Sequence, residues 1–331
     1  MARATRADLC MRVRVAALVT LTGSVLALSP VRAAAPPEFS GLAADHPTAE
    51  TSPLSLAAQG AMLPVPAGVY PIGHDGAAEA SRPAHRVRLS AFAIDRTEVT
   101  NAAFAEFLNA LSLDPRGVAG AGRVGPDHVA PGLYPLIAEG PSGSGRYPLI
   151  ALDDAEARIG VARGRFVPVA GFEDHPVTET TWAGARAYCR WRGARLPSEA
   201  EWEAAARGPG GRLYPWGDAP PDASRAFVSK RTGDTAPVGG RPAGASPFGV
   251  LDLSGSLAEW TSTLRRPYPY DAGDGREDPR APGERVTRGG DYRFDTQPER
   301  LTAVHRAGFS NAPERGHRHI GFRCALSLPP A

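Results

Sequence analysis

The chain has 331 residues and a formal net charge of +2, and its basic residues form no tract interleaved with aromatic residues. This pattern excludes the charge signature of a nucleic-acid-binding protein. With 37 glycines and 33 prolines, much of the backbone is expected to be irregular.

The N-terminus has the pattern of a secretory signal peptide. Arg12 and Arg14 precede an uncharged run over residues 15–28, and the small-residue stretch Val31–Ala35 follows it. The alternative, an uncleaved membrane anchor, is disfavoured because spanning a bilayer takes about 20 apolar residues. We therefore predict a signal peptide over residues 1–35, a periplasmic or secreted protein, and no integral membrane segment after cleavage.

Two segments follow the predicted signal peptide. Residues 36–60 are rich in Ala, Pro, Ser and Thr, which is typical of a flexible linker. Residues 61–329 are predicted to form one large domain with long loops. Within residues 112–170, Gly- and Pro-rich stretches surround two short apolar runs, and the pattern assigns no element there.

Strands and a helix are predicted at the start of the domain. Residues 62–73 hold short apolar runs broken by Pro and Gly, which favours strand and turn. Residues 86–94 alternate polar and apolar side chains, as a half-buried strand does. A helix is predicted to begin within residues 97–101, and its spacing places Phe104 and Phe107 on one face, toward a core.

Two further helix starts are visible in the sequence. Thr181 is a predicted N-cap. Ser198 is another, and Glu201 three residues later can bond back to the Ser198 amide, which makes a capping box; Gly208 ends this helix. All five tryptophans lie within residues 182–260, and such clustering is typical of a core.

Six sequence blocks together carry a family signature. The blocks are Arg195–Gly208, Tyr214–Asp218, Phe248–Gly255, Glu259–Thr261, Arg288–Gly290 and Ile320–Ala325. In this order they resemble the formylglycine-generating enzyme family, also called sulfatase-modifying factors. The resemblance implies an α+β, C-type-lectin-like fold with little regular secondary structure.

The cysteines suggest a disulfide. Cys10 lies in the predicted signal peptide, which leaves Cys189 and Cys324. An even pair in an oxidising compartment is a disulfide candidate. The resemblance implies the same pair, because family members with a structural bridge use the two matching positions. Two buried free thiols are the alternative.

The resemblance also implies a calcium site within one tight loop. In the family, a side-chain oxygen, two backbone carbonyls and a carboxylate hold the ion, and the matching positions are Asp252, Gly255, Leu257 and Glu259. Such oxygens are the hard ligands that calcium prefers. The alternative is that Asp252 and Glu259 only stabilise turns.

The copper site of the aerobic formylglycine-generating enzymes is not matched. Those enzymes bind copper through two cysteines in the loop after the Gly-Gly pair, and use it with oxygen to convert a sulfatase cysteine to an aldehyde. Phe294 and Glu299 occupy the two cysteine positions here. Because soft thiolates select copper(I), copper is not an expected cofactor. The chain is therefore interpreted as a divergent member that lacks the copper-binding pair.

Acids and imidazoles gather in the same C-terminal region. The catalytic candidates are Asp291, Asp295, Glu299 and His305, with His317 close to them in the sequence. Imidazole and carboxylate ligands suit non-haem iron, so a redox metal other than copper is one hypothesis. The alternative is that the acids of this Gly-rich loop are solvated, and that residues 317–319 lie at the surface.

Two classes of function follow. The first is an exported, metal-dependent oxidative enzyme that acts on a peptide, a protein or a peptide-derived small molecule and is not a copper formylglycine generator. The second is a non-catalytic binding or accessory module on a C-type-lectin-like scaffold. The fold alone does not choose between them, because function depends on the site.

Overall fold

The computed structural model describes residues 61–111, 136–137, 147–152, 154–307 and 315–329, which all belong to one compact unit. The predicted signal peptide (1–35) and linker (36–60) lie outside the described residues. Within the described part, no helix combines the length and the apolar character needed to cross a membrane.

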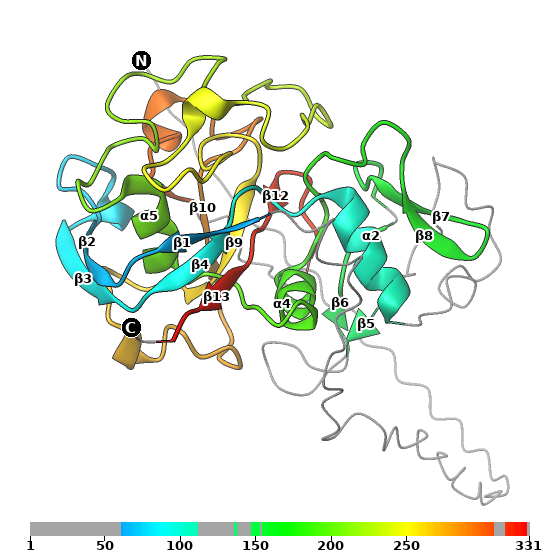
Figure 1. The fold of residues 1–331 in the computed structure, drawn as a ribbon, viewed down its shortest axis with the longest axis horizontal. Coiled ribbons are helices and arrows are strands. Elements are labelled where there is room, and N and C mark those ends of the chain that lie inside the picture. The colour runs from blue at the N-terminus through cyan, green and yellow to red at the C-terminus, as the bar shows by residue number, and fades with distance from the viewer. Residues whose placement is uncertain (1–60, 112–135, 138–146, 153, 308–314, 330–331) are drawn as a thin grey trace, which may run out of the picture. The chain divides into compact units, whose positions relative to one another are not determined.

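Short strands and a few short helices make up the fold (Figure 1). The strands are β1 (Met62–Val65), β2 (Gly68–Ile72), β3 (His85–Leu89), β4 (Phe92–Asp95), β5 (Leu136–Ile137), β6 (Tyr147–Pro148), β7 (Ile159–Ala162), β8 (Arg165–Pro168), β9 (Ala258–Leu264), β10 (Arg285–Arg288), β11 (Arg306–Ala307), β12 (Ile320–Gly321) and β13 (Ala325–Ser327). The α-helices are α2 (Asn101–Ala110), α4 (Trp182–Trp191) and α5 (Glu199–Arg207), and the 3-10 turns are η1 (Glu79–Ser81), η2 (Pro242–Gly244), η3 (Ala272–Asp274) and η4 (Pro298–Arg300).

The first sheet joins the two ends of the domain. Its strand order is β1-β4-β13, with both pairings antiparallel, so the C-terminal strand lies beside an N-terminal one (Figure 1). The single strand predicted over residues 86–94 is wrong in its continuity. The strand is interrupted at residues 90–91, because β3 pairs with β2 whereas β4 pairs with β1 and β13.

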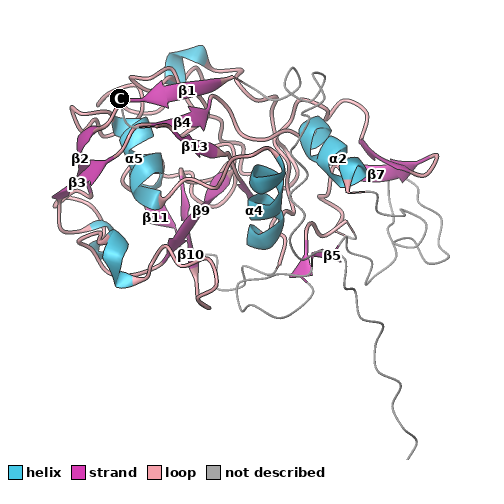
Figure 2. Cartoon of the chain, turned by 60° about the horizontal axis from the view of Figure 1, so that its bottom comes forward, coloured by secondary structure: helices cyan, strands magenta, loops and turns pink. Residues whose placement is uncertain are grey.

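The second sheet has the order β11-β10-β9-β12, with β12 parallel to β9. Helices α5 and α4 lie on either side of β9 (Figure 2). Strand β10 is buried along its whole length although an arginine stands at each of its ends, Arg285 and Arg288. Buried charge therefore lies in the middle of the domain.

Each predicted helix start is confirmed. The side chains of Thr100 and Thr181 cap α2 and α4. Ser198 and Glu201 form the capping box of α5, and Gly208 is its C-cap. These caps satisfy amides that the first turn of a helix cannot pair internally.

An aromatic core lies between α2 and α4. Phe104 and Phe107 are fully buried and contact the ring of Tyr188 at centroid distances of 5.6 Å. Cys189 and Cys324 belong to the same core and form the disulfide that the resemblance implied. Of the five tryptophans, three are fully buried, namely Trp182, Trp202 and Trp260. Trp191 is partly buried and packs against this core, whereas Trp216 is partly buried and stacks on Tyr214.

Candidate functional site

The loop after the Gly-Gly pair is folded tightly against the turn that contains η4. Gly290 has a φ of 69°. A Cβ atom on this residue would lie 2.6 Å from the carbonyl oxygen of Arg300, closer than real Cβ contacts allow. Glycine is therefore required here, and the close approach turns Asp291 and Asp295 toward the interior.

Asp291 shapes this loop from within. Its side chain is buried, and Oδ1 accepts the N–H groups of Arg293 at 2.7 Å and Phe294 at 2.6 Å. Burial raises the pKa of Asp291, while these backbone hydrogen bonds oppose the shift. Oδ2 has no hydrogen-bond partner among the described residues. One oxygen of this carboxyl group is thus committed to the loop.

The carboxyl group of Asp295 lies beside two basic side chains. Its Oδ1 lies 2.7 Å from Arg300 Nη1, and its Oδ2 lies 3.5 Å from His305 Nε2. Burial by itself raises the pKa of Asp295, but the hydrogen bonds and charges of His305 and Arg300 outweigh it and lower the pKa. The interpretation of these acids as solvated is wrong for Asp291 and Asp295, because the loop folds inward and supplies partners for them.

The residues at the two cysteine positions of the family both face solvent. The side chain of Phe294 is 48% exposed. Glu299 lies in η4 and is exposed as well. Of the four catalytic candidates, the structure therefore brings together Asp291, Asp295 and His305 and leaves Glu299 outside.

Three buried donor atoms at this loop have no hydrogen-bond partner among the described residues, namely Asp291 Oδ2, Asp295 Oδ2 and His305 Nε2. Asp295 faces Arg300 and His305, while Oδ1 of Asp291 faces backbone amides. In the part of the chain that the structure describes, no group of three or more His, Cys, Asp or Glu residues is arranged to hold a metal ion. A redox metal at these side chains stays a prediction.

A buried histidine lies beside the same loop. The surface expectation for residues 317–319 is wrong for His319, which is 8% exposed. Its ring lies edge-on to Phe294 and His317, at centroid distances of 5.0 and 5.8 Å. Burial, assisted by His317, lowers the pKa of His319 to about 4, so the ring is neutral at pH 7. The cause is tertiary, because β12 begins at the next residue and the His319 carbonyl accepts the Ala258 N–H at 2.9 Å.

The loop expected to bind calcium is organised around Glu259. This carboxylate is buried and accepts hydrogen bonds from Arg323 Nε and Nη2, at 2.7 Å each, and from the Trp202 indole at 2.8 Å. Asp252, near the other end of the loop, accepts the Gly239 N–H at 2.6 Å. Gly255 and Leu257 lie between them and carry the carbonyl groups of the expected ligand set.

Glu98 is a third carboxylate at this place, which the sequence reasoning considered only as part of a helix start. It accepts the Leu257 N–H at 2.9 Å and the Ser256 hydroxyl at 2.7 Å. Burial raises the pKa of Glu98 well above its usual value, and the charges of Asp252 and Glu259 add to the shift. Both oxygens of Glu259 are already bonded to Arg323, and the described residues do not arrange three carboxylates around one point. Calcium stays a prediction.

A second buried ionic group lies along α5. Glu203 accepts hydrogen bonds from Arg207 at 2.7 Å, from the Gly73 amide at 2.7 Å, and from Arg288. One turn earlier, Glu199 accepts a bidentate pair from Arg306 at 2.8 and 3.0 Å. These bonds fasten α5 to β10 and β11, and every side chain is buried. The pattern of the helix predicts its ends but not this network.

Known proteins resemble the chain over most of its length. Residues 47–328 match the Sulfatase-modifying factor enzyme 1-like domain. The chain is 36% identical over 273 residues to the formylglycine-generating enzyme of Streptomyces coelicolor, covering 75% of this chain and 82% of the relative. It is 35% identical over 232 residues to the hercynine oxygenase of Mycolicibacterium smegmatis, covering 63% of this chain and 47% of the relative. The chain therefore spans about half the length of that second relative.

A solved structure supports the fold. PvdO from Pseudomonas aeruginosa superposes with a TM-score of 0.53 and 22% sequence identity, covering 81% of this chain and 94% of that one. The architecture is α+β and C-type-lectin-like, with little regular secondary structure. With a domain match over residues 47–328 and 36% identity to a formylglycine-generating enzyme, this chain belongs to the sulfatase-modifying factor family.

Proposed function

We propose that this chain is an exported family member that binds a peptide or peptide-derived molecule and does not perform copper-dependent formylglycine chemistry. The observation that carries the proposal is the presence of exposed Phe294 and Glu299 where the family's copper enzymes have cysteines. A phenyl ring offers no donor atom, and a carboxylate is a hard ligand. Cys189 and Cys324 are bonded to each other, so neither supplies a thiolate. That disulfide also supports export, because disulfides persist in oxidising compartments.

The reaction itself provides the test. The purified mature protein is incubated with a Cys-x-Pro-x-Arg peptide, copper and oxygen, and the peptide is examined by mass spectrometry for the loss that accompanies aldehyde formation. We expect no aldehyde. The matched control is the double variant Phe294→Cys and Glu299→Cys, which restores both thiols and should bind copper(I) in competition with a chromogenic chelator. Copper-dependent turnover by the unmodified chain would contradict the proposal.

A binding role is favoured by the way in which the acids of the loop are used. Asp291 bonds to loop amides, and Asp295 is paired with Arg300 and His305. These bonds stabilise the loop and occupy one oxygen of each carboxyl group. Phe294 projects from the same loop and is 48% exposed, and we propose it as one contact for the ligand.

An oxidative, metal-dependent enzyme acting on a small molecule is the second candidate. The similarity to a hercynine oxygenase supports it. Metal analysis of the purified mature protein separates the two roles. A redox metal present at one equivalent per chain, and lost in the variant His305→Gln, would favour the oxidative role. Protein that contains no redox metal after exposure to iron and copper salts, and still binds peptide, would favour the binding role.

A further inference from the structure

We propose that the groove between β3 and α4 binds an acidic peptide segment in an extended conformation. The groove has a volume of about 700 Å³, which lies within the roughly 300–1,000 Å³ typical of ligand pockets. It shares no residue with the loop after Gly290 or with the loop from Asp252 to Glu259. The proposal therefore stands independently of the function proposed above.

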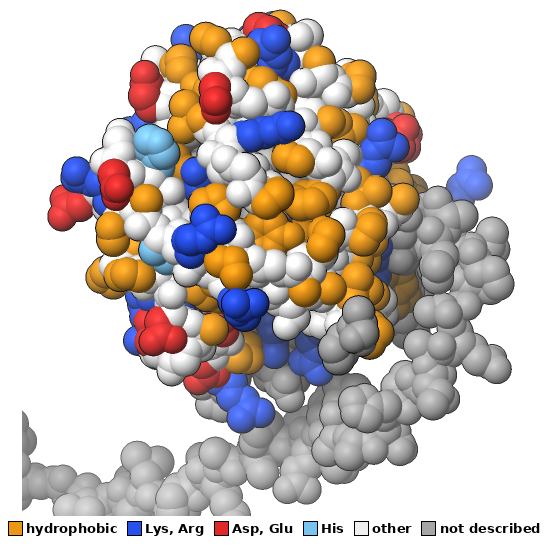
Figure 3. Space-filling view, turned by 60° about the vertical axis from the view of Figure 1, so that its left-hand side comes forward, with side chains coloured by type: hydrophobic (Ala, Val, Ile, Leu, Met, Phe, Trp, Pro, Cys, Tyr) orange, Lys and Arg blue, Asp and Glu red, His pale blue; other side chains and the backbone are white. Residues whose placement is uncertain are grey.

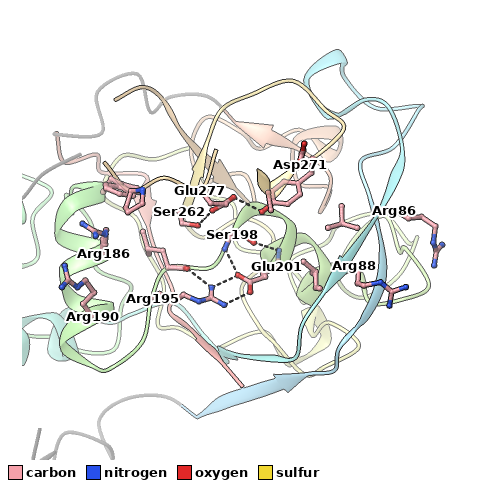
Figure 4. A pocket seen from close by; sticks show the side chains of 17 residues that line it. Arg86, Arg88, Arg186, Arg190, Arg195, Ser198, Glu201, Ser262, Asp271 and Glu277 are labelled. Carbon is pink, nitrogen blue, oxygen red and sulfur yellow. Dashed lines mark hydrogen bonds and ion pairs between the residues drawn. The ribbon is translucent and has the colours of Figure 1, made fainter. Parts of the chain in front are cut away.

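Arginines from two separate elements form opposite walls of the groove. Arg86 and Arg88 come from β3, and Arg186 and Arg190 come from α4 (Figure 4). The spacing of four residues places Arg186 and Arg190 on one face of their helix. In the close-up, the two pairs stand at opposite sides, with Ser198 between them at the start of α5. Nη2 of Arg86 donates to the Val69 carbonyl oxygen of β2 at 3.1 Å. An anionic chain lying in the groove would therefore meet Arg88 on one flank and Arg186 and Arg190 on the other.

The acidic side chains of the groove are already engaged. Glu201 accepts hydrogen bonds from Nη1 and Nη2 of Arg195, at 2.7 Å each. The charge of Glu201 is therefore balanced by that of Arg195. Glu277 accepts the hydroxyl groups of Ser262 at 2.5 Å and Tyr270 at 2.9 Å. The charged lining as a whole consists of Arg86, Arg88, Arg186, Arg190, Arg195, Glu201, Asp271 and Glu277, which is net positive. A basic peptide is therefore disfavoured, and an acidic one is attracted.

Strand β3 offers main-chain groups to such a peptide. Among the described strands β3 pairs only with β2, so its second edge carries no strand. The four consecutive residues 86–89 all line the groove. Because consecutive side chains point to opposite faces of a strand, this indicates that the groove runs along the edge of β3. His85 accepts the Tyr270 N–H at 2.8 Å and anchors the start of the strand. An exposed edge held in place is suited to strand addition by an extended peptide.

The remaining lining supplies contacts for apolar side chains. Val87, Leu89 and Tyr270 line the groove and are partly exposed. Figure 3 views the molecule from the side on which β2 and β3 lie in Figure 1; apolar side chains gather near the middle of that face, with Lys and Arg side chains around them. Since side chains alternate along a strand, the best occupant alternates acidic and apolar residues. Edge arginines also deter pairing with unrelated strands, so acidic character selects the partner.

The probe is a fluorescein-labelled hexapeptide of alternating Glu and Val, titrated against the full mature protein by fluorescence anisotropy. The double variant Arg88→Glu and Arg190→Glu should weaken binding by roughly tenfold or more, because it places like charges on both walls. The matched control, Arg165→Glu with Arg231→Glu, makes the same change in net charge at exposed positions outside the groove and should bind as the unmodified protein does. Circular dichroism confirms that each variant is folded.

Two further probes examine the components of the proposal. A hexapeptide with Gln in place of Glu should bind more weakly, as should the acidic peptide N-methylated at alternate residues, which keeps its charge but loses main-chain donors. Equal affinity of the groove variant and its control would overturn the proposal. Full binding of the N-methylated peptide would overturn strand addition, and displacement by millimolar inorganic phosphate would indicate a small-anion site instead.

Discussion

The guanidinium group of Arg323 binds both carboxylate oxygens of Glu259, at 2.7 Å each, and neither side chain reaches solvent. The same guanidinium donates to the carbonyl oxygens of Asp95 at 3.0 Å and Leu251 at 2.9 Å. One side chain thus connects the C-terminal block of the family signature to β4 and β9.

Replacing Arg323 with Met should strongly destabilise the fold. The variant leaves Glu259 buried without its counter-charge, which costs about 3–5 kcal/mol when one partner of a buried pair is removed. The control is Arg265→Met, whose partner Glu284 lies at the surface, with side-chain exposures of 38% and 25%; there the loss should be about 0–1 kcal/mol. Urea unfolding measures both. Equal, small losses would mean that the buried pair contributes little.

A calcium chelator should lower the melting temperature if the loop from Asp252 to Glu259 holds the ion. A ligand that binds only the native state stabilises it by mass action. Asp252→Asn keeps an oxygen for the Gly239 amide while removing the charge, and should abolish the response to chelator. This variant is preferable to Glu259→Ala, which also unpairs Arg323. Identical melting curves with and without chelator would refute the calcium assignment.

Stability should fall on acidification in a way that depends on His319. Burial lowers the pKa of His319 from 6.5 to about 4. Between these values the unfolded chain binds a proton that the folded chain does not, so the free energy of unfolding decreases as the pH falls through this window. The contribution is up to about 3 kcal/mol.

Because carboxylates titrate in the same range, the measurement is a difference between variants. His319→Gln should flatten the pH dependence of the free energy of unfolding between pH 6.5 and 4, relative to the unmodified protein. The control is the same substitution at exposed His74, which should leave the slope as it was. If His319→Gln left the pH dependence of the free energy of unfolding unchanged, the pKa of His319 would not be lowered by burial, and the prediction would be wrong.

The Cys189–Cys324 disulfide should contribute substantially to stability. It joins residues separated by 135 positions, and closing so long a loop contributes roughly 5 kcal/mol in the chain-entropy model. The double variant Cys189→Ala and Cys324→Ala should melt at a lower temperature than the oxidised protein and at about the same temperature as the reduced one. Alkylation of unreduced, denatured mature protein should find neither thiol by mass spectrometry. Two alkylated cysteines would show that the bridge does not form.

Much of the fold could be anticipated from local patterns. The caps Thr181 and Ser198, and a helix start within residues 97–101, can be read from the sequence because a cap satisfies amides within one turn of itself. The buried face of α2 followed from the spacing of Phe104 and Phe107. The continuous strand over residues 86–94 failed because the alternation of side chains does not reveal which sheet each half joins.

The sequence by itself determined the family, the helix ends, the cysteine pair and the absence of the copper thiolates, since each depends on residue identity or on neighbours a few positions away. Only the tertiary structure decided the burial of Asp291, Asp295 and His319. It also determined that Arg288, in a buried strand, pairs with Glu203, 85 positions earlier. Charged side chains are buried only where distant elements supply their partners, and no local pattern records which elements will meet.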